Sequence, residues 1–408
     1  MTDALWSLIT TPWTLQPDTL LGATVLALAA ALLGEAVWRI LRWPRLIGYV
    51  LVGAALALSG RGADGDEPAL RVAIDGALAL LLFEAGARLK LRWLARNPWL
   101  LATSVAESLL TGIAVYAALR SLGIAAEACA PLAIVAVCVS PAVLQRVVGE
   151  LHAAGQVTER LLALAALNTL YAVLAMKLLS AGWLLSDPRT WLDALSPVLF
   201  SFCGSILLGA ALGEGLALIA RRFDLREDNS VVLLLAAVLL ALVVAKTLQL
   251  SSLLVPLLAG IWLANRSERP WIWPRHFGSA GGVLVLVMFV AVASAWTPQV
   301  LAQAALPAAG LVLARLLAKA AAVIALARPS GLGFGQAACL ATGLLPLSAT
   351  AWVLALDFTA RHPAIGGTLM PVLLAALAML ELLAPLAVMA SLRTAGEVDL
   401  PPRGHGAR

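Results

Sequence analysis

The chain has 408 residues, of which 62% are hydrophobic and 12% are charged, and its mean hydropathy is +0.94. This composition excludes a soluble protein of this length, and the length excludes a chain with a single membrane span. The formal charge of +5 calls for no nucleic acid partner, because basic residues gather in the cytoplasmic loops of multi-pass membrane proteins.

Apolar runs of about 18–25 residues, each long enough to cross the bilayer core as a helix, follow one another along the chain. With the loop signals between them, they predict an all-α membrane protein with thirteen spans. The predicted spans are about 20–38, 46–60, 70–87, 98–119, 129–145, 161–183, 195–219, 230–247, 250–264, 278–296, 304–327, 335–357 and 368–392.

The basic residues predict the direction of these spans. If the first loop is cytoplasmic, nineteen Lys and Arg residues fall on that side of the membrane and five fall on the other. The positive-inside rule therefore predicts a bacterial inner-membrane protein with its N-terminus outside and its C-terminus inside. On this topology, residues 1–19 are a periplasmic segment and residues 394–408 are a short cytoplasmic tail.

We expect a structural or functional role for each carboxylate within the predicted spans, because a charge at the centre of a bilayer costs roughly 2.5–3.5 kcal/mol. Glu84 lies one turn before Arg88, so an ion pair at the cytoplasmic rim competes with a functional role. Glu107 and Glu381 are more central, and for both a structural or dimer-contact role competes with a role in transport. Glu381 has no basic residue nearby in sequence, so it must pair across helices, face a cavity or carry a proton.

The fifth and sixth spans carry polar features in otherwise apolar runs. Ser140-Pro141 interrupts the fifth span, because proline removes a backbone hydrogen bond and clashes with the preceding turn. In lipid such a break is tolerated only where the freed polar groups face protein or a water-filled cavity. The sixth span holds the adjacent polar pair Asn168-Thr169.

The eleventh span carries Lys319 near its centre, too deep for its ammonium to reach the interface easily. We therefore expect an ion pair or a functional role for this lysine. Arg315, one turn earlier, has a similar depth and either shares the counter-ion of Lys319 or marks a later start of the span.

The twelfth span contains Gly343, Pro346, Ser348 and Thr350, which predict a second break at about 343–350. The two interrupted spans are seven apart and so cross the membrane in opposite directions. Corresponding breaks in oppositely oriented halves indicate an inverted-repeat secondary transporter, with repeats of about 20–183 and 230–392. For either span alone, a simple proline kink is the competing explanation.

The sequence predicts neither an enzyme nor a bound cofactor. It contains no Ser/His/Asp, metal-ligand or phosphate-loop constellation, and its four histidines fall in the predicted loops. A transported ion is the only metal that we expect.

Several segments resemble one known family in their order and spacing. They are RWPRLIGYVLVG (42–53), LLLFEAGARLK (80–90), the stretch from Ser140 to Gly155, and ERLLALAALN (159–168). Over residues 20–393 the chain resembles the monovalent cation:proton antiporter superfamily, which includes the sodium/proton exchangers and the Kef-like transporters. The resemblance implies a homodimer of thirteen-helix subunits, in which a core with two crossed broken helices moves against a dimerisation domain to give alternating access.

The resemblance also implies roles for individual residues. Ser140-Pro141 stands in the first broken helix, and Asn168-Thr169 stands where members carry the ion-binding pair. Lys319 matches a lysine that pairs with the core acidic site, and Glu84 matches a glutamate of the sodium/proton exchanger branch. The departure is Thr169, which replaces the usual ion-binding aspartate and cannot carry a proton.

Three readings follow for the function. The favoured reading is a Na⁺ or K⁺/proton antiporter whose titrating group has moved to Glu84 or, as a second choice, to Glu381. The second is a transporter on the same scaffold for an anion or small organic acid, because Lys319 and half-helix N-termini would make a positive site. The same alternative includes a transporter uncoupled from protons, because Thr169 replaces the ion-binding aspartate. The third is a transport-inactive relative that acts as a partner or sensor. A carboxylate within ion-pair reach of Lys319 would favour the first reading.

Overall fold

The computed structural model describes residues 19–60, 68–184, 191–222, 229–266, 277–347 and 349–398, and within these ranges every regular element is helical. Almost all of the predicted segment 1–19, residues 399–408 of the predicted tail, and Ser348 lie outside the described residues. The elements are α2 (Thr19–Ala36), the π-helical turn η1 (Val37–Leu41), α3 (Arg45–Leu58), α4 (Pro68–Ala87), α5 (Leu91–Arg96), α6 (Pro98–Ser121), α7 (Ala126–Val137), α8 (Pro141–Leu151), α9 (Gln156–Leu184), α10 (Trp191–Arg222), α11 (Asn229–Thr247), α12 (Leu254–Arg266), α13 (Phe277–Ser294), α14 (Pro298–Ala325), α15 (Phe334–Gly343), α16 (Ala349–Arg361) and α17 (Pro363–Thr394).

Each predicted span coincides with one of these helices or with a consecutive pair of them. By length and composition, seven helical segments of the described chain can cross a membrane, the pair α7–α8 counting as one, and four shorter apolar helices accompany them. Large apolar side chains on their outer faces, such as Leu28, Leu109 and Leu207, are exposed as lipid contact requires. The multi-pass all-α class is therefore confirmed, whereas the number of thirteen spans stays a prediction.

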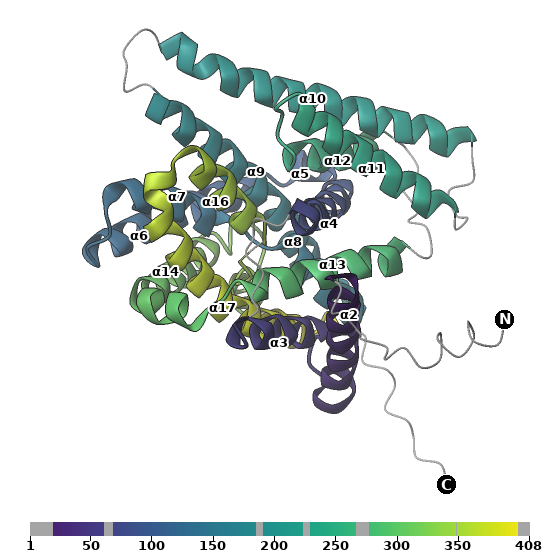
Figure 1. Cartoon of the computed structure of the whole chain (residues 1–408). Coiled ribbons are helices and arrows are strands. Elements are labelled where there is room, and N and C mark those ends of the chain that lie inside the picture. The colour runs from purple at the N-terminus through teal and green to yellow at the C-terminus, as the bar shows by residue number, and fades with distance from the viewer. Residues whose placement is uncertain are drawn as a thin grey trace, which may run out of the picture.

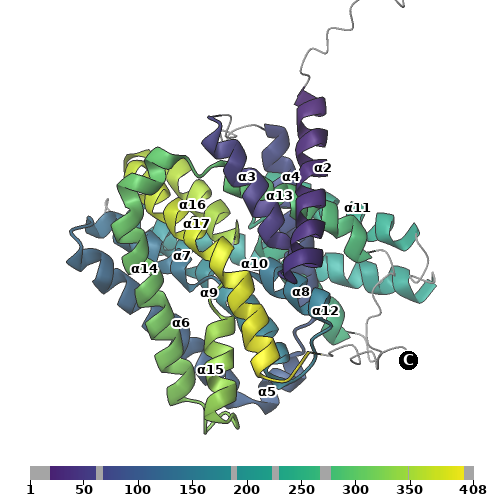
Figure 2. The same ribbon diagram turned by 90° about the horizontal axis from the view of Figure 1, so that it is seen from below.

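The helices form two groups that lie side by side (Figures 1 and 2). One group contains α6, α7, α14, α15, α16 and α17, and the other contains α2, α3, α4, α10, α11, α12 and α13. Helix α9 contacts members of both groups, and so does α8. The buried polar cluster of the candidate site belongs to α6 and α14 of the first group and to α9.

Small residues let the helices of the second group pack backbone to backbone. A Cβ on Gly86 of α4 would stand 2.1 Å from the carbonyl oxygen of Leu257, and a Cβ on Gly260 of α12 would stand 2.1 Å from that of Phe83. Any side chain at either position would push α4 and α12 apart, as at other small-residue contacts between membrane helices. This contact makes α4 and α12 a tightly joined pair.

The two predicted helix breaks are confirmed. Helix α7 ends at Val137 and α8 begins at Pro141, while α15 ends at Gly343 and α16 begins at Ala349. Pro141 fits the first position of α8 because it has no N–H to satisfy there. The Ser140 hydroxyl accepts a hydrogen bond of 3.3 Å from the backbone N–H of Val143 and so caps the new helix.

Helix α9 is capped from a distant part of the chain. The carboxylate of Glu397, beyond the end of α17, accepts hydrogen bonds of 2.7 Å from the backbone N–H groups of Val157 and Thr158, and one of 2.8 Å from the Thr158 hydroxyl. The backbone carbonyl of Glu397 also accepts a hydrogen bond of 2.9 Å from the backbone N–H of Ala154. These bonds satisfy orphan donors of α9 with a negative charge, which a helix N-terminus favours.

Replacing Glu397 by Ala should therefore lower the stability of the protein by about 1–2 kcal/mol, the usual cost of a lost charged cap. The measurement is the unfolding temperature of purified protein, followed by intrinsic tryptophan fluorescence. Glu159→Ala is the matched control, because it removes an exposed acidic residue from the same first turn without removing these bonds. Equal losses in both variants would contradict a specific cap.

Candidate functional site

The two helix breaks meet inside the protein. The backbone N–H of Ser140 donates to the carbonyl of Pro346 at 3.1 Å, which joins the first break directly to the second. The side chain of Arg315 on α14, fully buried, donates to carbonyls of both breaks. Its acceptors are Ala136 (2.8 Å) and Cys138 (2.8 Å) at the end of α7, and Leu345 (2.6 Å) and Pro346 (3.1 Å) after α15.

This arrangement satisfies the groups that breaking a helix leaves unpaired. The last carbonyls of a helix have no partner within the helix and carry a partial negative charge. The guanidinium of Arg315 is a planar cation with five donors, so one side chain can serve two helix ends at once. Arg315 is therefore the cation that stabilises the crossing of the two broken helices.

Next to this crossing, three helices bring together a buried polar cluster. Lys319 on α14 donates to one carboxylate oxygen of Glu107 on α6 at 2.5 Å, and both side chains are almost completely buried, with 1% and 0% exposed. The other carboxylate oxygen accepts from the Asn168 side-chain amide on α9, also at 2.5 Å. The Ser108 hydroxyl donates to the Asn168 carbonyl oxygen at 3.1 Å, and Lys319 also donates to the Val137 carbonyl at 3.3 Å.

Both side-chain cations of this region already have partners. Lys319 contacts the Glu107 carboxylate, and Arg315 donates to four backbone carbonyls. Neither cation is left without a partner to bind an anion. The geometry favours the hypothesis of a cation transporter over the hypothesis of an anion transporter.

The remaining residues of the predicted site lie near the cluster but play smaller parts in it. Thr169 is fully buried, and its hydroxyl donates to the carbonyl of Ala165 one turn earlier at 2.9 Å. Thr350 is fully buried in the first turn of α16. Gly343 ends α15 where a Cβ would stand 2.7 Å from the Leu161 side chain of α9. These positions shape the crossing, and none of them supplies a titratable group.

The structure does not bring Glu84 to Lys319. Glu84 forms an ion pair of 2.7 Å with Arg88, one turn later on α4, and lines a separate cavity of about 490 Å³. Residues four apart in a helix lie on the same side of it, so the Glu84–Arg88 ion pair forms without any tertiary contact. The carboxylate that reaches Lys319 is Glu107, which the sequence ranked below Glu84.

Glu381 is buried on α17, and neither of its carboxylate oxygens has a hydrogen-bond partner among the described residues. Its backbone carbonyl also lacks the usual helical partner, because Pro385 has no N–H to donate four residues later. Glu381 does not take part in the Glu107–Lys319 pair.

Sequence reasoning missed Ser108 and the role of Arg315. Arg315 donates to backbone carbonyls instead of sharing Glu107 with Lys319, and α14 begins earlier than the predicted span, at Pro298. Ser108 fixes the orientation of Asn168, and Arg315 holds the two breaks together. For Arg315 a signal was present, because residues four apart lie on the same helix face and Lys319 already pointed inward. For Ser108 no signal separates it from the many other serines of membrane helices.

Over most of its length the chain is similar to known proteins in family and fold. The family model described as "Sodium/hydrogen exchanger, transmembrane" matches residues 26–393. Two solved structures of the sodium/proton antiporter MjNhaP1 from Methanocaldococcus jannaschii share the fold. The structure at pH 8 has 15% identity and a TM-score of 0.62, and the match covers 92% of this chain and 96% of that one. The electron-microscopy structure has 17% identity and a TM-score of 0.72, and the match covers 96% and 100%. No curated protein matched the chain.

Proposed function

Because the chain belongs to the sodium/hydrogen exchanger family, we propose that it is a secondary transporter that exchanges a monovalent cation for protons. We propose further that Glu107 is the carboxylate at which the two compete. One observation carries this assignment: a buried carboxylate on α6 is held by the Lys319 ammonium and the Asn168 amide, beside the crossing of two broken helices.

The chemistry of exchange follows from this contact. A monovalent cation that reaches Glu107 must take the place of the Lys319 ammonium, since both need the same carboxylate oxygens. When the cation leaves, the carboxylate regains a proton-bearing partner, either by protonation of Glu107 or by return of the protonated lysine. The oxygens of Asn168 and Ser108 are the neutral ligands nearest to the carboxylate. Thr169 therefore need not titrate for exchange to occur.

Transport also requires access from both sides of the membrane in turn. Glu107 and Lys319 are enclosed on all sides, so neither side has open access in this conformation. Cavities of about 820 Å³ and 490 Å³ lie near opposite ends of α4, the first beside Arg71 and the second beside Glu84. We propose that movement of the broken-helix group extends one or the other cavity to Glu107, which is alternating access.

We propose that the protein resides in a bacterial inner membrane with its N-terminus outside and its C-terminus inside. The alternation of basic loops supports this orientation. The assignment places the 820 Å³ cavity on the outer side and the 490 Å³ cavity on the cytoplasmic side. We propose a homodimer on the strength of the resemblance to the family. A transporter domain of about 20–393, with repeats of about 20–183 and 230–392, is part of the same proposal.

The test is proton movement in liposomes that contain the purified protein. The wild-type protein should dissipate an imposed pH gradient when Na⁺ or K⁺ is added, and Glu107→Gln should reduce this response to background. Glu107→Asp keeps the charge on a shorter side chain and should retain measurable exchange at a lower rate. Glu84→Gln is the matched control and should exchange like the wild type.

Two outcomes would overturn the assignment. Full exchange by a correctly folded Glu107→Gln protein would place the proton site elsewhere. Loss of exchange in Glu84→Gln, with Glu107→Gln active, would restore the role that the sequence first suggested for Glu84. Size-exclusion chromatography of each variant shows whether the protein is folded before transport is judged.

A further inference from the structure

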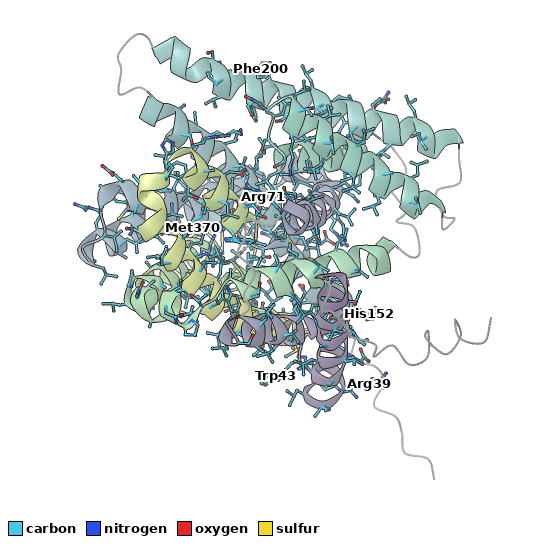
Figure 3. The ribbon with its side chains drawn as sticks, in the orientation of Figure 1. Arg39, Trp43, Arg71, His152, Phe200 and Met370 are labelled. Atoms are coloured by element: carbon cyan, nitrogen blue, oxygen red, sulfur yellow. The ribbon has the colours of Figure 1, made fainter. Side chains whose placement is uncertain are left out.

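A charged cavity of the described chain lies outside the Glu107–Lys319 cluster. It has a volume of about 820 Å³ and is lined by the first turns of α4, the ends of α9, α11 and α16, and the first turns of α10. Figure 3 labels two of its lining residues, Arg71 on α4 and Phe200 on α10. Its charged lining residues are Arg71, Asp75, Lys177, Lys246, Asp357 and Arg361.

The carboxylates of this cavity are already paired. Asp357 forms an ion pair of 2.9 Å with Arg71, and Asp75 forms a close ion pair with Lys246. The other two cations, Lys177 and Arg361, make no ion pair or hydrogen bond with any residue of the described ranges. Among the described lining residues, four cations therefore face two carboxylates, and the excess is two positive charges.

The two unpaired cations line the same cavity and interact electrostatically. Lys177 of α9 lies within electrostatic range of Arg361 of α16, which repels it, and of Asp357, which attracts it. Lys177 is only partly exposed, so its charge is incompletely hydrated. A half-buried ammonium near a second cation is costly unless an anion compensates it.

A hydroxyl of the cavity wall is also without a partner. Ser201 on α10 is buried, with 5% of its surface exposed, and its hydroxyl has no hydrogen-bond partner among the described residues. Buried polar groups are nearly always hydrogen-bonded to protein or water, so this hydroxyl is available to a water or a solute in the cavity. The side chains of Gln249 and Ser252 line the same cavity and add further donors.

We propose that this cavity is an anion-binding site for a group carrying two negative charges, such as a phosphate or a dicarboxylate. Lys177 and Arg361 neutralise the charge, and Ser201 donates a hydrogen bond. The volume is within the range of sites for small organic ligands. Glu107 does not line this cavity, so the bound anion does not take the place of the transported cation. On the proposed function this cavity is the outer access route, so an anion held there regulates access to Glu107. The anion is either free in solution or the headgroup of an anionic lipid.

The experiment is a titration of the purified full-length protein with inorganic phosphate and with succinate. Unfolding temperature is followed by tryptophan fluorescence, in nanodiscs of phosphatidylcholine and at constant ionic strength. We expect a saturable rise in the unfolding temperature of the wild-type protein. The variant K177Q/R361Q should weaken this binding by about tenfold or more, because both charge-assisted contacts are lost. R92Q/R96Q removes two exposed charges of α5 and should bind like the wild type.

The design separates specific binding from other effects. Phosphate stabilises many proteins by exclusion from their surface, but that effect does not saturate and persists in K177Q/R361Q. Removing a half-buried, unpaired lysine charge should not destabilise the fold, so the variant remains testable. Glu107→Gln should bind the anion normally, which distinguishes failure of this proposal from failure of the exchange proposal.

A second arm identifies the source of the anion. In nanodiscs that contain cardiolipin, whose headgroup carries two negative charges, a lipid headgroup would already occupy the site and abolish the response to phosphate and succinate. A free anion as the ligand would leave the response unchanged by the lipid. The proposal is overturned if no saturable shift occurs with either probe in phosphatidylcholine, or if K177Q/R361Q responds like the wild type.

Discussion

Replacing Lys319 by Ala should destabilise the protein by about 3–5 kcal/mol, the usual cost of removing one partner of a buried ion pair. The variant leaves Glu107 charged and fully enclosed, with only the Asn168 amide to compensate it. The measurement is the unfolding temperature of the purified protein, together with the yield of monodisperse protein in detergent. Exchange should slow as well, because only protonation of Glu107 itself then competes with the cation.

The control for Lys319→Ala removes both charges together. In E107L/K319M two apolar side chains of similar size replace the pair, and such replacements are often neutral or even stabilising. We therefore expect this double variant to unfold at about the wild-type temperature while showing no exchange. An equally large loss of stability in both variants would mean that packing, and not charge pairing, determines the effect of Lys319→Ala.

Replacing Arg315 by Met should have an effect of similar size, for a different reason. Four carbonyls at the two breaks lose this donor at once. Pro346 keeps the bond from the Ser140 N–H, and each buried acceptor left unpaired costs about 1–3 kcal/mol before relaxation. Arg315→Lys should fall in between, because an ammonium has three donors and no planar fork. Arg120→Met is the matched control, since Arg120 is exposed and donates to a single carbonyl, that of Ile124.

The measurement for the Arg315 series is the unfolding temperature, read with the yield of folded protein. The expected order is Arg120→Met at the wild-type value, then Arg315→Lys, then Arg315→Met. If Arg315→Met unfolded at the same temperature as Arg120→Met, the crossing would be held together by other contacts, such as the bond from Ser140 to Pro346.

The sequence predicted the positions of the broken helices because proline removes a backbone hydrogen bond wherever it stands. Proline alone does not decide a break, since Pro131, Pro307 and Pro385 lie inside the continuous helices α7, α14 and α17. The two broken spans differed in the polar residues or glycine beside their prolines, at Ser140-Pro141 and at Gly343 to Pro346. The need of Lys319 for a partner was predictable in the same way, since a central lysine in a span has no local means of compensation.

The identity of that partner was not predictable from local pattern. Glu107 lies 212 residues from Lys319 in the chain, and no periodicity or spacing connects the two. Glu84 drew attention because its surroundings resemble a family motif, yet its nearest opposite charge is one turn away on the same helix. Only the packing of α6 against α14 decides which carboxylate meets the lysine.

The contacts of Arg315 have a mechanical consequence. Four acceptors around one rigid, flat group fix an angle as well as a distance, so the end of α7 cannot slide or rotate past the end of α15 while these bonds last. The crossing is therefore a rigid unit, and no hinge lies between the ends of α7 and α15. Any movement that opens a path to Glu107 must therefore move the ends of α7 and α15 together, and the backbone must bend in the surrounding loops.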